Sequence, residues 1–178
     1  MNYYALQVKT NGEEAFISEA TRALSFRQRE QRFFAPRRRL VIRRQGKKTE
    51  ELKAVFPGYV FLETPQVDHT LYRLVRGVKG FFRFLKNNHD ITPLSGPDLA
   101  IISHFQSFGG IAESSKAYFD ENDRIVITEG PLQGFEGAIV KVDKRKQRVK
   151  LRLDFSQQKF TIDLAFEMIE KAEQRRAG

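Results

Sequence analysis

The first residues of the chain, MNYYALQVKT, alternate in the pattern of a strand. Tyr4, Leu6 and Val8 fall on one face, and Tyr3 and Ala5 fall on the other. A period of two residues is that of an extended chain, and apolar residues on one face indicate that this face is buried. We therefore expect a strand over residues 3–8.

The next segment has the period of a helix. Its apolar residues recur three or four positions apart and comprise Phe16, Ile17, Ala20 and Leu24. This spacing predicts an amphipathic helix. Thr10 precedes it, and Glu13 comes three residues later, which is the spacing of a capping box at a helix N-terminus.

The segment between residues 32 and 56 predicts a hairpin. Leu40 and Ile42 point to one side of its first arm, and Gln45 and Gly46 supply the turn. Charged residues flank both arms, so the tip of the hairpin should be exposed and positively charged.

The stretch VFPGYVFLE, residues 55–63, combines a Pro-Gly pair with a run of strand formers. Alternation places Tyr59 and Phe61 on one face and Val60 and Leu62 on the other. Taken alone, the pattern predicts a core strand entered through a turn, because large apolar side chains are usually buried. The pattern leaves open whether one of the two faces serves a partner instead.

Helices and a strand follow each other before residue 108. Residues 71–75 fit a short amphipathic helix, GFFRFLK fits a strand, and Ser95 with Asp98 marks the start of another helix. The connections are too irregular for a parallel doubly wound sheet. We therefore expect an antiparallel sheet flanked by helices.

The pattern changes near Gly109. Residues 109–121 contain paired glycine, serine and charged residues without sustained periodicity, which is typical of a linker. Short strands then follow closely, in RIVIT, GAIVKV, RVKLRLDF and KFTIDL. Several short strands in about 50 residues do not form a stable flat sheet alone, so we expect them to close into a small β-barrel.

Glycines mark the loops of this second half. Gly130, followed by Pro131, fits a tight turn, and Gly134 fits a loop conformation that a side chain would oppose. Gly137 fits the start of the next strand, at a point where backbones approach closely.

Composition narrows the possible functions. The formal net charge of +9 favours a polyanionic partner, because each phosphate neutralised by Lys or Arg releases counterions. The alternative is a basic surface that only keeps the protein in solution. With no cysteine and three histidines, neither a disulfide framework nor a zinc site is expected. Without a signal sequence or an apolar run of about 20 residues, we expect a cytoplasmic protein with no membrane partner.

The sequence carries few signs of catalysis. It lacks a Gly-x-Ser-x-Gly elbow, a Walker loop and a histidine pair at metal spacing. Its clustered carboxylates, Asp120, Glu121 and Asp123, lie in or beside the predicted linker with no obvious base. We expect a binding protein with no enzymatic activity and no cofactor.

The segment EGPLQGFEGAIVKVDKRKQRVKLRL, residues 129–153, resembles the KOW motif of small SH3-like barrels. Together with YYALQVKTNGEE, FPGYVFLE and RGVKGF in the first half, it resembles the NusG family of transcription elongation factors along essentially the whole chain. The resemblance implies an α+β fold with an NGN-like domain at 1–108, a linker at 109–121, a KOW barrel at 122–172 and a tail at 173–178.

The resemblance also implies a function in transcription elongation and antitermination. NGN domains bind the clamp helices of the largest RNA polymerase subunit, bridge the DNA channel and suppress pausing. The residues here that match this contact surface are Tyr4, Phe56, Pro57, Gly58, Tyr59 and Phe61. His69 and Thr70 match a second polymerase contact, although helix capping by Asp68 explains this segment equally well.

Two basic groups are candidates for binding nucleic acid. They are Arg37, Arg38, Arg39, Arg43 and Arg44 in the first hairpin, and Lys144, Arg145, Lys146, Arg148 and Lys150 in the second. The first group would contact DNA at the transcription bubble, and the second would contact nascent RNA. For both, the alternative is a solvated face without a ligand, and on the first hairpin such charge also discourages edge-to-edge strand pairing.

The predicted barrel also carries candidate partner-binding residues. The family resemblance implies that Leu132, Phe135 and Phe155 meet Rho or a small-subunit ribosomal protein.

LDFSQQKF departs from the family's usual loop, and with the basic hairpins it is closer to the LoaP group of operon-specific antiterminators than to the general factor. The alternative function is that of a KOW-containing, ribosome-associated RNA-binding protein. We expect a monomer.

Overall fold

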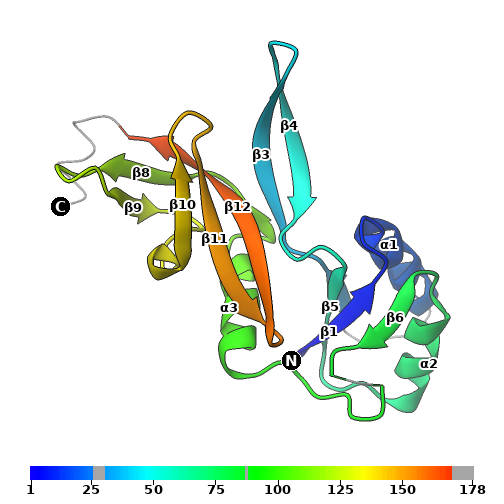
Figure 1. The fold of residues 1–178 in the computed structure, drawn as a ribbon. Helices are drawn as coiled ribbons and strands as arrows, with labels where there is room; N and C mark the ends of the chain where they lie inside the picture. The colour runs from blue at the N-terminus through cyan, green and yellow to red at the C-terminus, as the bar shows by residue number, and fades with distance from the viewer. Residues whose placement is uncertain (26–30, 87, 170–178) are drawn as a thin grey trace. The chain divides into compact units, whose positions relative to one another are not determined.

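The computed structural model describes residues 1–25, 31–86 and 88–169 (Figure 1). Contacts divide these residues into two units. Unit 1 contains residues 1–36 and 54–101, and unit 2 contains residues 37–53 and the described residues from 102 onward. The predicted tail, residues 173–178, and the last residues of the predicted KOW domain lie outside the described residues.

Unit 1 is an antiparallel sheet with two helices, as the alternation and helical periods predicted. The strand order is β2-β5-β1-β6. The strands are β1 (Asn2–Val8), β2 (Arg32–Phe34), β5 (Tyr59–Thr64) and β6 (Phe81–Phe84). The helices are α1 (Glu13–Leu24) and α2 (His69–Gly77).

The hydrophobic core of unit 1 lies between the two helices and one face of this sheet. Strand alternation brings Leu6, Val60 and Leu62 to that face, where they pack with Phe16 of α1 and Leu71 of α2. All five side chains are at most 1% exposed. The prediction that Val60 and Leu62 belong to the core is therefore confirmed.

The start of α1 differs from the predicted capping box. The helix begins at Glu13 with Gly12 at its N-cap and no capping side chain. Asn11 has a positive φ of 63°, and the Gly12 N–H donates to the Lys9 carbonyl, so a turn separates Thr10 from the helix. The predicted cap at α2 is confirmed, because the Asp68 carboxylate accepts from the Leu71 N–H at 2.7 Å.

Unit 2 begins with the predicted hairpin, formed by β3 (Arg37–Arg44) and β4 (Lys47–Ala54). Gln45 and Gly46 both have positive φ, 49° and 77°, as a two-residue hairpin turn of the favoured handedness requires. A short strand, β7 (Ile111–Ala112), pairs in parallel with β3 and gives the sheet order β4-β3-β7.

The C-terminal part of unit 2 is a curled, barrel-like sheet of five strands in the order β10-β11-β12-β8-β9. The strands are β8 (Ser115–Phe119), β9 (Ile125–Glu129), β10 (Ile139–Asp143), β11 (Arg148–Phe155) and β12 (Gln158–Met168). Along β11, Val149, Leu151 and Leu153 are buried while Lys150 and Arg152 are exposed, so the predicted basic exterior of this wall is confirmed.

Part of the predicted linker is wrong, because residues 115–119 form β8. This strand pairs with β9 and, in parallel, with β12. Its buried residues are Ser115 and Ala117, whose small side chains gave no apolar signal in the sequence.

The glycines of the KOW motif play different parts. Gly130 has φ of 105°, and a Cβ there would lie 2.8 Å from the Cα of Ser115, so only glycine fits. Gly134 has φ of 83°, as its loop prediction requires. Gly137 lies in a 3₁₀ turn, η1 (Glu136–Ala138), with open space around it, so the close backbone approach predicted there is wrong.

The helix α3 (Gly96–Ser107) begins directly after Ser95, and its buried residues are Ile102 and Phe105. None of the helices in the described ranges is long and apolar enough to cross a membrane.

Candidate functional site

A row of aromatic rings lies on the unit 1 sheet, on the face that turns away from the two helices. Tyr3 packs edge-on against Phe34, with ring centroids 5.6 Å apart. Phe34 stacks on Phe61 at 5.6 Å, and Phe56 packs edge-on against Phe61 at 6.2 Å. We call Tyr3, Phe34, Phe61 and Phe56 the aromatic row.

Strand register explains how the row forms. Phe34 of β2 and Ala5 of β1 are the direct partners of Phe61 on the two sides of β5. Because neighbours in register share a face, Phe34 and Phe61 meet, while the small Ala5 leaves room beside Phe61. Tyr3 sits two residues from Ala5 along β1 and therefore also points to this face.

Polar side chains border the row. The Arg32 guanidinium lies over the Phe34 ring, 5.4 Å from its centroid, and pairs with the Glu63 carboxylate at 3.0 Å. On the far side of β1, the Arg83 Nε donates to the Gln7 Oε1 at 2.8 Å. An aromatic centre with a polar border is the usual composition of a protein-binding surface.

The members of this face differ in exposure. Phe56, Tyr59 and Phe61 are 1%, 3% and 0% exposed. Tyr3 and Phe34 are half-buried. Burial raises the pKa of Tyr59, and the nearby positive charge of Arg83 partly opposes that shift.

The structure brings together only some of the residues predicted to bind polymerase. Phe56 and Phe61 are in the row, and Tyr59 shares the alternation of Phe61. Tyr4 is opposite Leu62 and packs in the helix-covered core, so it does not join them. Sequence reasoning missed Tyr3 and Phe34. The alternation of Arg32, Phe33 and Phe34 was the available signal, but the pairing of β2 with β5 could not be read from it.

A hydrogen bond to the first residue of α1 holds the Pro-Gly turn before β5. Pro57 is exposed, while Gly58 is buried with φ of 83°. The Gly58 N–H donates to the Glu13 Oε1 at 2.6 Å, and a Cβ on Gly58 would lie 3.1 Å from the Thr10 Oγ1. His69 and Thr70, the other predicted polymerase contact, are exposed in the first turn of α2.

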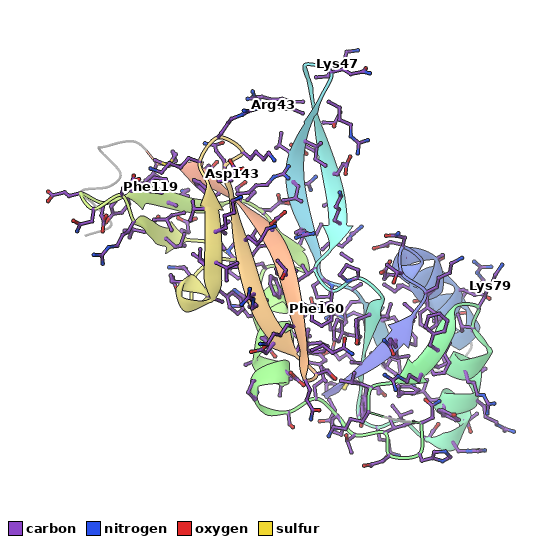
Figure 2. The ribbon with its side chains drawn as sticks, viewed as in Figure 1. Arg43, Lys47, Lys79, Phe119, Asp143 and Phe160 are labelled. Carbon is purple, nitrogen blue, oxygen red and sulfur yellow. The ribbon has the colours of Figure 1, made fainter. Side chains whose placement is uncertain are left out.

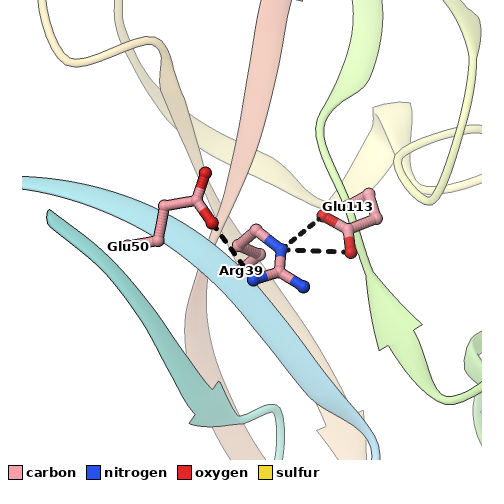
Figure 3. A network of polar contacts seen from close by, with 3 residues as sticks. All are labelled: Arg39, Glu50 and Glu113. Atoms are coloured by element: carbon pink, nitrogen blue, oxygen red, sulfur yellow. Dashed lines mark hydrogen bonds and ion pairs between the residues drawn. The ribbon is translucent and has the colours of Figure 1, made fainter.

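Two of the predicted DNA-binding arginines hold unit 2 together instead of facing solvent freely. The Arg38 Nη1 donates to the Asp163 carbonyl at 2.8 Å, and burial lowers the pKa of Arg38. The Arg39 Nε contacts the Glu113 carboxylate at 2.9 Å, and its Nη1 contacts Glu50 at 3.2 Å (Figure 3). Hydrogen bonding to Glu113 raises the pKa of Arg39.

The other residues predicted to bind nucleic acid also include cations in ion pairs, alongside cations that are exposed near the hairpin ends. Lys144 pairs with Asp123, and its ammonium lies 4.1 Å from the centroid of the Phe119 ring. Arg44 is 3.5 Å from Glu51. The exposed cations nearer the ends of the two hairpins are Arg43, Lys47, Lys48, Arg145 and Lys146. Figure 2 labels Arg43 and Lys47 near the far end of the β3–β4 hairpin.

The predicted partner-binding residues of the barrel are mostly enclosed. Leu132 and Phe155 are both 0% exposed. Phe135 is half-buried and stacks on Phe105 of α3 with ring centroids 5.8 Å apart. The His104 ring also contacts Phe135, and its Nε2 is 2.8 Å from the Pro131 carbonyl oxygen.

The described part of the chain was searched for groups of metal-ligating side chains. Within residues 1–25, 31–86 and 88–169, no three His, Asp or Glu side chains are grouped to hold a metal ion. The site's geometry is that of contact surfaces, one aromatic and one basic.

Both halves of the chain match known protein families. The family model described as "Transcription termination factor nusG" matches residues 1–103, and the KOW motif matches residues 121–152. The chain is 24% identical to the transcription termination/antitermination protein NusG of Helicobacter pylori J99, covering 96% of this chain and 98% of that protein. It is 25% identical to NusG of Thermus thermophilus, covering 97% and 99%.

A solved structure, "Domain interaction in Thermotoga maritima NusG", has a similar fold, with a TM-score of 0.60 at 21% identity over 92% of this chain and 93% of that one. The family model alone covers more than half of the 178 residues and includes every strand of the aromatic face. The chain belongs to the NusG family of transcription termination and antitermination factors.

Proposed function

We propose that this protein binds RNA polymerase during elongation, through the aromatic face of unit 1, and suppresses pausing or termination. The observation that carries the proposal is the aromatic row, four ring-to-ring neighbours on a sheet face opposite the helix-packed core. Aromatic side chains dominate the energy of protein interfaces because they bury a large area at a small entropy cost. The clamp helices of the largest polymerase subunit are the proposed partner.

The side chains of this face differ in how accessible they are to a binding partner. Tyr3 and Phe34 are half-buried and therefore already accessible. Phe56, Tyr59 and Phe61 are at most 3% exposed, so binding through them requires that they be uncovered first. The exposed His69 and Thr70 at the start of α2 are a second proposed polymerase contact.

The barrel-like sheet would serve further partners, namely nascent RNA, Rho or a small-subunit ribosomal protein. Protein partners that use Leu132 and Phe155 need these enclosed side chains to be exposed, whereas Phe135 is already half-buried. The basic hairpins favour an operon-specific antiterminator over the general factor. A ribosome-associated RNA-binding protein explains only the KOW motif and leaves the family match over residues 1–103 without a role.

Terminator read-through in a purified transcription system tests this function. We expect the wild type to raise read-through, and Tyr3→Ala with Phe34→Ala to remove most of the effect. Phe82→Ala is the matched control, because Phe82 is 62% exposed on the same sheet but outside the row. Equal activity of the row variant and the control would contradict the proposal.

The choice of templates separates the general from the operon-specific role. We expect strong read-through on a minority of unrelated terminators and little effect on the rest. Equal effects on all templates would overturn the operon-specific part while leaving polymerase binding intact.

A further inference from the structure

The hairpin β3–β4 and the turn between β10 and β11 form a cleft inside unit 2. Its volume is about 430 Å³. Five cationic side chains line it, from both hairpins: Arg43, Lys48, Arg145, Lys146 and Arg148. No carboxylate is among the lining residues, which are otherwise Val41, Ile42 and Gln147. The two basic groups that are far apart in the sequence therefore meet in one place.

Specific contacts hold the two walls of the cleft together. The Arg148 Nη2 donates to the Val41 carbonyl, and both residues line the cleft. Further along β3, Arg38 bonds to the Asp163 carbonyl of β12 at 2.8 Å, and Arg39 bonds to Glu113 at 2.9 Å. Arg38 and Arg39 thus fix the hairpin without lining the cleft, whereas Arg148 both lines the cleft and bonds to its opposite wall.

The positive surface continues beyond the cleft. An adjoining hollow is lined by Lys141, Lys146, Arg148 and Lys150, together with the carboxylates Asp143 and Asp163. Lys146 and Arg148 line both depressions, so the charge is continuous. The pKa of Asp143 is lowered, first by the Lys146 backbone N–H and then, against some desolvation, by the charges of Lys146, Lys141 and Arg145.

The lining residues indicate which groups of an anionic partner the cleft could recognise. Arg and Lys supply only hydrogen-bond donors, which suit phosphate oxygens. The cleft contains no aromatic side chain, and sequence-tolerant binding of single strands relies on bases stacking on aromatic rings. A partner whose bases are already paired and whose backbone faces outward fits this lining better.

We propose that the tip of the β3–β4 hairpin and the β10–β11 turn form one composite site that binds the phosphate backbone of double-stranded nucleic acid. A single duplex engages both walls at once, so the hairpin and the barrel act as one binding element. This inference goes beyond the polymerase contact and does not depend on the aromatic row.

Fluorescence anisotropy tests the site with the whole 178-residue chain and no polymerase. The probes are a labelled RNA hairpin, a DNA duplex of the same sequence and the corresponding single strands, at about 0.1 M salt. The variants neutralise one wall at a time: Arg43→Gln with Lys48→Gln, and Arg145→Gln with Lys146→Gln. The control, Lys79→Gln with Arg152→Gln, makes the same change in net charge at exposed residues outside the lining and away from the hairpin tip.

We expect one duplex to bind per protein. Each wall variant should weaken the affinity for this duplex about tenfold or more, and the control should weaken it less than about threefold. Each wall variant should also reduce the slope of log K against log salt by about 1 to 2, for one or two lost phosphate contacts. The duplex that binds more tightly identifies RNA or DNA as the source of the backbone.

Three results would overturn the proposal. An equal loss for the control would show diffuse attraction without a site. Tighter binding of the single strands would contradict a duplex ligand. Two duplexes per protein, each lost with only one wall variant, would show two separate sites. Failure of this test leaves read-through by the row variants unaffected, so the two proposals fail separately.

Discussion

The buried carboxylate of Glu13 accepts a hydrogen bond from the backbone N–H of Gly58, with 2.6 Å between Oε1 and N. This contact joins the first residue of α1 to the turn that leads into β5, whose outward-facing residues include Phe61 of the aromatic row. The aromatic face is therefore positioned by a polar contact from the opposite side of the sheet.

Removing that acceptor should destabilise unit 1. We expect Glu13→Ala to lower the free energy of unfolding by about 1–3 kcal/mol, because the buried Gly58 N–H loses its partner. Glu13→Gln keeps an acceptor oxygen and should cost less. Chemical denaturation of both variants measures the difference, and equal losses would show that the bond does not contribute.

Gly130 should be the least replaceable glycine of the KOW segment. Gly130→Ala places a side chain at φ of 105° and 2.8 Å from the Ser115 Cα. We expect a loss of about 2–6 kcal/mol, because backbone strain and a clash with backbone atoms each cost about 1–3 kcal/mol. Gly137→Ala is the control, since Gly137 has open space and no positive φ. Thermal unfolding of the two variants compares them, and equal stability contradicts this account.

The turn that carries one wall of the basic cleft should respond to acid. The Asp143 carboxylate accepts the Lys146 N–H at 2.9 Å, which is the main cause of its lowered pKa. A carboxyl group whose pKa is lowered by folding stabilises the folded state above its unfolded value, 3.8, and this contribution is lost as the pH falls through the lowered pKa.

Nuclear magnetic resonance can follow this titration through the Lys146 amide. We expect its chemical shift to change with a midpoint below pH 3.8, and the change to disappear in Asp143→Asn. A midpoint at or above 3.8 would show that the bond to Lys146 does not hold the carboxylate in its charged form.

Arg38 should be more important to the hairpin than Arg39, although the sequence pattern predicted the same role for both. Arg38→Ala removes a partly buried bond to the Asp163 carbonyl, and we expect a loss of about 1–2 kcal/mol and faster amide exchange along β3. Arg39 pairs with Glu113 and Glu50 at the surface, so Arg39→Ala should have a smaller effect that fades with salt. The reverse order in hydrogen exchange would contradict this assignment.

Local chemistry made several features predictable from the sequence. The Gln45–Gly46 turn needs two positive φ values, and alternation along β11 separates Leu151 from Lys150 without reference to other strands. Val60 and Leu62 followed from the same period of two. The capping box at Thr10 failed because Asn11 takes a positive φ and a turn separates Thr10 from the helix; the Asn11–Gly12 pair was the available signal for that turn.

Features that depend on long-range pairing could not be predicted. Phe34 joins the row only because β2 pairs with β5, and Tyr4 leaves it only because β1 places that residue opposite Leu62. The cleft likewise needs the hairpin near Val41 to meet Arg148, more than a hundred residues away. Periodicity assigns each side chain to a face, but strand order and register decide which faces meet.

The affinity of the 178-residue chain for core RNA polymerase is the decisive measurement for the proposed polymerase-binding surface. The wild type is compared with Phe56→Ala plus Tyr59→Ala, with Tyr3→Ala plus Phe34→Ala, and with the control Phe82→Ala, after circular dichroism has shown that each variant is folded. We expect each of the two double variants to weaken polymerase binding by about 30-fold or more, because losing interface anchors worth about 2 kcal/mol changes the affinity by that factor. The control should bind like the wild type. Unchanged polymerase affinity in the folded variants would contradict the assignment of the aromatic face as the polymerase-binding surface.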